Sequence, residues 1–365
     1  MTKHPIAAKT KESHKPLPYS TPMSLKDLYG CIHSEMQQVD AVLRRELSDS
    51  FPFVDEVVQY AFQLGGKRLR PALVLLVGKA SQKEISQNSV GENAIPHELI
   101  LIAAVVEMIH TATLVHDDIL DGAAIRRHLP TLHTRWDAGI SVMAGDMIFT
   151  KALKLVAHLE SMVPYQVIAG ACHDTCYGEL RQMGTRNEFG ISVAEYLDIV
   201  AAKTAALLEC SCQMGAFYAG ASPEIVDEFR LFGRELGMAF QMVDDLLDLI
   251  GNEQSMGKTL GTDIAQRKPT LPLLLYFESL PLEERLKAIR QCSDSASDEK
   301  FVQNLVTKMR HAGAVEAALA TARQMVDSAT ARLDRFVETN PRSGESQNAV
   351  DSLRKLAQFV VQREK

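Results

Sequence analysis

Two short acidic motifs are the residues of this chain best suited to chemistry. The first lies in "LVHDDILD" and places Asp117, Asp118 and Asp121 within an apolar run. The second, in "FQMVDDLLD", repeats the DDxxD spacing from Asp244, 127 residues after Asp117. A single motif of this kind is most often a solvated helix face. Two such motifs among Leu, Val, Ile and Met would repel strongly unless cations lay between them.

Helical geometry places several candidate side chains on common faces. At about 100° per residue, His110, Asp117 and Asp121 share one stripe of a helix predicted from about His97 to Asp121, with Asp118 roughly 100° round.

The second motif follows the same geometry. Gln241, Asp244 and Asp248 are spaced i, i+3 and i+7, which predicts one face of a second helix, and Asp245 flanks them.

The carboxylates indicate a metal and its ligand. Hard oxygen ligands select Mg²⁺, which keeps several waters and normally needs phosphate oxygens to complete its shell. The implied ligand is therefore a diphosphate.

A basic stretch agrees with an anionic ligand. "QLGGKRLRPALVLL" places Lys67, Arg68 and Arg70 just before Pro71, which is predicted to begin a helix. Backbone N–H groups at that helix start would add to the positive side chains and form an anion site. A solvated basic loop is the alternative.

Further cations follow both motifs. Arg126 and Arg127 come directly after the first motif, where they would clamp phosphate, although such a pair is often surface. Lys203 lies in the apolar "IVAAKTAALLE", where it snorkels or meets a partner. Lys258 and Lys268 are ordinary loop lysines or, with Lys203, a cationic wall for the same diphosphate.

Composition bounds the class of protein. The chain has 365 residues, 46% of them hydrophobic, and a net charge of −7 that gives no support for nucleic-acid binding. The best apolar run, Leu99 to Val106, is ended by Glu107, so we predict no transmembrane segment. Residues 1–22, with lysines and prolines, are predicted to be a disordered arm. Helical periodicity over residues 23–365 predicts one large all-α domain.

The cysteines favour a reducing compartment. No CxxC pair occurs among the six. Cys172 and Cys176 beside His173 would permit a metal site, but buried thiols in the cytoplasm are the simpler interpretation.

These motifs resemble the trans-isoprenyl diphosphate synthases, closest to the long-chain polyprenyl members. The resemblance rests on "GGKRLRP", "HDDILDxxxxRR", "KTA", "FQMVDDLLD" and "GKTLGTD…RKPTLPLL", and it runs from about Phe51 to the C-terminus. It implies an all-α bundle around a deep central cavity, usually a homodimer. It also implies Mg²⁺-dependent head-to-tail condensation of isopentenyl diphosphate with an allylic diphosphate.

The resemblance assigns roles to particular residues. Asp117, Asp121 and Asp244 should hold Mg²⁺, while Asp118, Asp245 and Asp248 complete the acidic motifs. Isopentenyl diphosphate should be bound by Lys67, Arg70, His110 and Arg127. The allylic substrate should be contacted by Arg126, Lys203, Thr204, Gln241, Lys258 and Lys268.

Product length in this family depends on what closes the cavity below the first motif. Bulky aromatic residues four and five positions before Asp117 mark short-chain enzymes, and here Thr113 and Ala112 are small. The resemblance therefore implies a long-chain product, and geranylgeranyl diphosphate is the alternative. The next candidates for the cavity floor are Met147, Phe149 and Leu153.

Two other functions remain open. A head-to-head or cyclising terpene enzyme also uses two acidic motifs, but it needs no separate site for isopentenyl diphosphate. A non-catalytic subunit of a heteromeric synthase would be expected to lose a motif, and both are complete here. The family often has glycine after the arginine pair, where this chain has His128.

Overall fold

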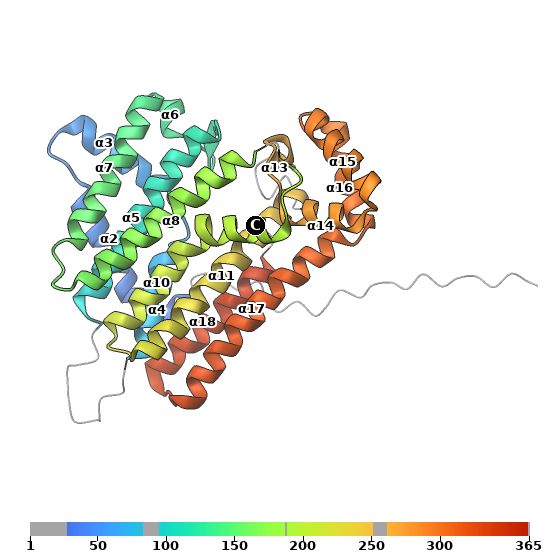
Figure 1. Ribbon diagram of the computed structural model, residues 1–365. Helices are drawn as coiled ribbons and strands as arrows, with labels where there is room; N and C mark the ends of the chain where they lie inside the picture. The colour runs from blue at the N-terminus through green and yellow to red at the C-terminus, as the bar shows by residue number, and fades with distance from the viewer. Residues whose placement is uncertain (1–27, 83–94, 187, 251–260, 364–365) are drawn as a thin grey trace, which may run out of the picture.

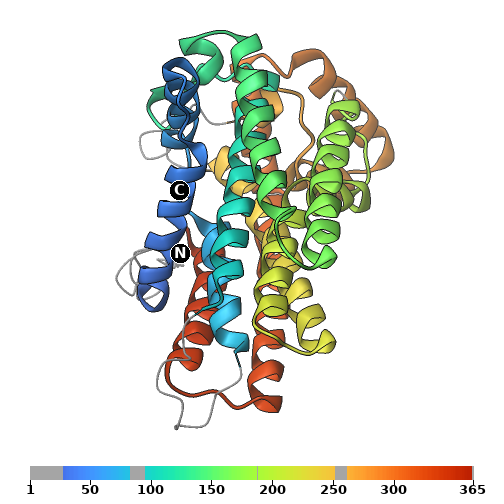
Figure 2. The ribbon, with the colours of Figure 1, turned by 90° about the vertical axis from the view of Figure 1, so that its left-hand side faces the viewer.

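The computed structural model describes residues 28–82, 95–186, 188–250 and 261–363. Helices dominate these ranges, and the long ones run roughly along one direction (Figures 1 and 2). The prediction of an all-α bundle is confirmed. Residues 1–22, predicted to be a disordered arm, lie outside the described ranges, and the division at residue 22 stays a prediction.

The N-terminal half carries the first motif. Its elements are η1 (Gly30–Ile32), α2 (His33–Leu47), α3 (Pro52–Gln63), α4 (Leu69–Ser81), α5 (His97–Leu120), β1 (Ile125–Arg126), β2 (Leu129–Pro130), α6 (Leu132–Arg135), α7 (Ala138–Val156) and α8 (Met162–Gly184).

The C-terminal half carries the second motif. Its elements are α9 (Val193–Val200), η2 (Ala201–Ala205), α10 (Ala206–Tyr218), α11 (Pro223–Ile250), α13 (Thr262–Ala265), α14 (Leu271–Ser279), α15 (Leu282–Ser295), α16 (Glu299–His311), α17 (Ala314–Thr339) and α18 (Gly344–Gln362).

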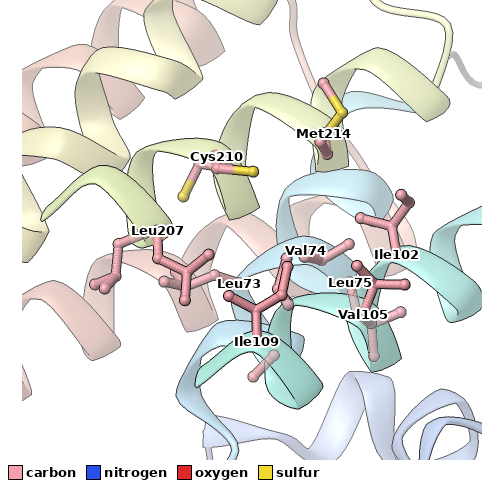
Figure 3. Close-up of a cluster of buried hydrophobic side chains, with 14 of the residues drawn as sticks. Leu73, Val74, Leu75, Ile102, Val105, Ile109, Leu207, Cys210 and Met214 are labelled. Atoms are coloured by element: carbon pink, nitrogen blue, oxygen red, sulfur yellow. The ribbon is translucent and has the colours of Figure 1, made fainter. Parts of the chain in front are cut away.

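The core is centred on α4, α5 and α10. Figure 3 shows their apolar side chains meeting, among them Leu73, Ile109 and Met214. The two acidic motifs lie near the C-terminal ends of α5 and α11, two of the longest helices. Packing of their apolar faces therefore fixes where the carboxylates lie.

Helix α5 is apolar because it is buried. Among the residues described, it alone is long and apolar enough to cross a bilayer, with a mean hydropathy of 1.9 over its best window. However, 72% of that window is buried inside the molecule, as in the central helix of a packed core.

One predicted boundary differs from the structure. Helix α4 begins at Leu69 rather than Pro71, because Arg68 adopts a left-handed backbone (φ 55°) that starts the helix two residues earlier.

Candidate active site

One large cavity collects most of the predicted residues. Its volume is about 1570 Å³, above the roughly 300–1,000 Å³ of ordinary small-molecule sites. The predicted residues that line it are Lys67, Arg68, Arg70, His110, Asp117, Asp118, Asp121, Arg126, Arg127, Lys203, Thr204, Gln241, Asp244, Asp245 and Lys268.

Two glycines let arginines lie against the loop before α4. A Cβ on Gly65 would lie 2.9 Å from the Phe62 carbonyl oxygen, and one on Gly66 would lie 3.0 Å from Nη2 of Arg127. Arg127 also donates from Nη1 to the Gly65 carbonyl at 2.8 Å. The paired glycines therefore join this loop to the residues after the first motif.

Lys67, Arg70, His110 and Arg127 line one part of the cavity, which we call the basic corner. Nε of Arg70 is buried and has no hydrogen-bond partner in the described ranges. Burial lowers the pKa of Arg70 to about 10, so it stays charged at neutral pH. Burial, with the charge of Arg70, lowers the pKa of His110 well below its usual range. This corner therefore presents fixed cations beside a neutral imidazole.

Arg127 and His128 form the tight turn of the β1–β2 hairpin. Both have positive φ, 51° and 66°, as a type I′ turn requires. Such positions favour glycine. This preference gives a physical reason for the glycine that the resembled family often has at the position of His128.

Each aspartate of the first acidic motif interacts with a cationic side chain of the protein. Arg126 grips Asp118 with two bonds from Nε, 2.8 and 2.9 Å long. Lys268 donates to both oxygens of Asp121 at 3.0 and 3.1 Å. Burial raises the pKa of Asp117 to about 6, against the opposing charge of Lys203. The predicted stripe of His110, Asp117 and Asp121 does face one cavity.

A π-helical turn positions Lys203. In η2 the backbone passes so close to α8 that a Cβ on Gly178 would lie 2.4 Å from the backbone nitrogen of Lys203. Nζ of Lys203 pairs with Glu179 and donates to Gln182 at 2.7 Å. Single π turns of this kind are frequent at functional sites.

The second motif is fixed mainly by hydrogen bonds. Thr204 donates to Gln241 at 2.9 Å, and Gln241 donates to Asp245 at 2.8 Å. Tyr196 donates to the other oxygen of Asp245 at 2.6 Å. Burial, with the charge of Asp263, raises the pKa of Asp245 to about 8.

Asp244 points into the cavity and meets the end of the chain. Its side chain is 55% exposed, whereas that of Arg363, 3.2 Å away, is only 6% exposed. Arg363 also stacks over the Phe240 ring at 3.9 Å. The last described residue therefore lies beside the second motif.

Asp248 corrects one prediction. It was expected to share the face of Gln241 and Asp244, but it is not among the residues that line the cavity. Its carboxylate accepts bonds from the Thr262 hydroxyl at 2.5 Å and the Asp263 N–H at 3.0 Å. Residues 262 and 263 therefore cover this side of the helix. Lys258 lies outside the described residues.

The structure also adds residues to which the sequence assigned no role in the site. Glu107 lies inside an apolar run, and Arg186 lies beyond α8, where it donates to Asp121 at 2.8 Å. Only tertiary packing brings these residues to the site, together with Tyr196, Glu179 and Arg363.

The predicted floor residues are not reached by the cavity. Neither Met147, Phe149 nor Leu153 lines it, whereas Thr113 and Leu180 do. The three α7 residues are partly buried, and Met147 and Phe149 pack against the main core.

The donor set fits a hard cation that shares a phosphate. In the described part of the chain, no three His, Cys, Asp or Glu residues lie close enough to hold a metal by themselves. Carboxylates of both motifs border one cavity together with lysines and arginines. Oxygen atoms of a bound diphosphate would have to complete any metal shell.

Known proteins share this sequence and fold. The family model "Polyprenyl synthetase" matches residues 51–309. Heptaprenyl diphosphate synthase component 2 of Geobacillus stearothermophilus is 31% identical over 94% of this chain and 100% of its own. The short chain isoprenyl diphosphate synthase of Methanothermobacter thermautotrophicus is 33% identical over 91% of this chain and 97% of its own.

A solved structure gives the same answer. The polyprenyl synthase of Caulobacter crescentus, complexed with calcium and isoprenyl diphosphate, superposes with a TM-score of 0.83 and 29% identity over 95% of this chain and 100% of that one. The chain therefore belongs to the polyprenyl synthetase family of prenyltransferases.

Proposed function

We propose that this protein condenses isopentenyl diphosphate head-to-tail with an allylic diphosphate in an Mg²⁺-dependent reaction that yields a long-chain all-trans-polyprenyl diphosphate. One observation carries the proposal: a single cavity joins two carboxylate motifs to a separate basic corner. Two anionic substrates thus have two chemically different subsites.

The acidic side suits the allylic substrate. Asp117, Asp121 and Asp244 would hold Mg²⁺, which when bound neutralises charge on the departing diphosphate. Lys203 and Lys268 would exchange their carboxylate partners for its oxygens. The allylic C–O bond then breaks and leaves an allylic cation.

The basic corner suits isopentenyl diphosphate. Lys67, Arg70 and Arg127 would hold its diphosphate, and His110 would donate a hydrogen bond as a neutral imidazole. The double bond of isopentenyl diphosphate attacks the allylic cation to form the new C–C bond. The resulting cation then loses a proton to the released diphosphate. Thr204 and Gln241 would orient the allylic group.

A long product is supported by the small residues below the first motif. Thr113 lines the cavity and Ala112 is buried beside it, so neither closes the space under Asp117. A heptaprenyl relative agrees with this proposal. The alternative, geranylgeranyl diphosphate, is supported by the short-chain relative.

Product analysis tests these proposals. Purified protein with Mg²⁺, farnesyl diphosphate and labelled isopentenyl diphosphate should give dephosphorylated products well beyond twenty carbons, and EDTA should abolish them. Thr113→Phe should shorten the products. A wild-type product of twenty carbons would favour the alternative. No incorporation with any primer would favour a subunit role, which the "component 2" relative keeps open.

We also propose a cytoplasmic homodimer. Large apolar side chains are exposed on α7 and α8, among them Met143 (66%) and Met162 (65%). A second copy would bury this face. All six cysteines are free thiols, as a reducing cytoplasm favours. Sedimentation of wild type and Met143→Glu would test the assembly, since the variant should dissociate.

A further inference from the structure

A buried carboxylate lies beneath the basic corner. Glu107, on α5, is 1% exposed, and its Oε1 accepts a 2.6 Å bond from Nη1 of Arg68. The charges of Arg70 and Arg127 also act on it. A carboxylate beside a subsite for anions opposes their binding electrostatically, so its presence there needs a reason.

Arg68 turns toward the protein's own acids. Its Nε lies 3.8 Å from Asp40, and its guanidinium lies 5.3 Å from the Phe62 ring centre. Its backbone is left-handed, with φ of 55°, at the residue that precedes α4. A non-glycine residue keeps this conformation only where its surroundings hold it.

Arg68 sits between the two cations expected to bind the substrate. Lys67 precedes it and Arg70 is the second residue of α4, so its backbone angles set the directions of both. The bond to Glu107 ties this point of the chain to α5, the helix that also carries His110.

We propose that Arg68 and Glu107 form a positioning pair for the isopentenyl diphosphate subsite. The pair locks the left-handed turn before α4 and so aims Lys67 and Arg70 into the cavity. Arg68 itself contacts no substrate. This inference rests on the proposed function and deepens it.

Glu107→Gln separates positioning from simple electrostatics by the sign of its effect. Removing a negative charge beside an anion subsite strengthens anion binding if charge alone matters. Loss of the lock weakens it, by roughly tenfold or more for displaced charge-assisted contacts. The measurement is calorimetric binding of isopentenyl diphosphate in EDTA, where neither metal nor catalysis contributes. Equal or tighter binding by the variant would overturn the proposal.

Glu235→Gln is the matched control. Glu235 accepts two 3.1 Å bonds from Arg332 between α11 and α17, outside the cavity lining. This variant should bind isopentenyl diphosphate as wild type does, even if it unfolds at a lower temperature. Both variants should keep the wild-type KM for farnesyl diphosphate within about twofold, because the lock acts on one subsite.

Two more variants complete the test. Glu107→Asp keeps the charge but withdraws the carboxylate, so it should also weaken binding, and it replaces Glu107→Gln if that variant fails to fold. Arg68→Gln combined with Glu107→Gln should lose no more affinity than either single change. Additive losses would show that Arg68 contacts the substrate itself. Wild type that binds isopentenyl diphosphate yet makes no product would count against the proposed function alone.

Discussion

The two acidic motifs share one spacing but occupy different surroundings. In the first, Asp117, Asp118 and Asp121 all border the cavity. In the second, Asp244 and Asp245 line the cavity, with Asp245 hydrogen-bonded to Tyr196 and Gln241, whereas Asp248 does not line it and bonds to Thr262 instead. Identical sequence spacing therefore does not give identical roles, because the neighbouring elements decide which oxygens stay available.

The largest expected effect tests what the motifs share. Asp117→Ala and Asp244→Ala should each lower kcat by about 10²- to 10³-fold or more, since each removes a proposed metal ligand. Neither should lower the unfolding temperature. Steady-state incorporation of isopentenyl diphosphate and thermal melts measure both quantities. Normal turnover by Asp244→Ala would remove the second motif from the metal site.

The next prediction tests where the motifs differ. Asp248→Ala leaves the half-buried Thr262 hydroxyl and Asp263 N–H without this acceptor, which should reduce the free energy of unfolding by about 1–3 kcal/mol. Asp121→Ala, at the matching position, should instead impair Mg²⁺-dependent turnover. Urea titration of both variants compares them. Equal stabilities would indicate that the two positions are equivalent after all.

A pH series distinguishes the helices that carry the motifs. Burial lowers the pKa of His110 on α5, whereas α11 offers the uncharged Gln241 near its motif. Below about pH 6.5 the unfolded chain takes up a proton at His110 and the folded chain does not. The free energy of unfolding should therefore decrease by about 1.4 kcal/mol for each unit by which the pH is lowered.

The matched variant is His110→Gln. It should flatten this part of the stability profile between about pH 6.5 and 5, as followed by urea unfolding at each pH. A wild-type profile identical to that of the variant would show that His110 is protonated in the folded protein.

The smallest effect concerns the counter-ions. Arg363→Gln should tighten binding of Mn²⁺ in the presence of inorganic diphosphate by about two- to fivefold, because the guanidinium competes for Asp244. Arg126→Gln releases Asp118, which is not a proposed metal ligand, so it should change Mn²⁺ binding less. Mn²⁺ titration followed by electron paramagnetic resonance would compare them. Weaker binding by Arg363→Gln would show that Arg363 assists the metal instead.

The sequence predicted those features of the site that depend on helical periodicity. The stripe of His110, Asp117 and Asp121 follows from 3.6 residues per turn within a long apolar helix. The basic loop at GGKRLRP also lines the cavity, although the sequence did not indicate that Arg68 pairs with Glu107.

Tertiary packing decided the rest. Asp248 has the right spacing, but residues 261–263 cover it, and no local pattern shows this. Arg186 and Arg363 are unremarkable in sequence and reach the site only through folding. The cavity floor depends on how deep the helices leave open space, which apolar spacing on α7 does not reveal.

The apolar character of α5 also matters while the protein is being made. This helix packs most extensively against α7, whose last residue, Val156, follows Leu120 by 36 positions. At about 5–20 residues per second, the ribosome takes roughly 2 to 7 seconds to supply that cover. During that time the apolar face of α5 that α7 later covers is exposed to water. Glu107 and the aspartates that end the helix raise the cost of inserting it into a bilayer, so the charges of the site also oppose membrane insertion of this segment.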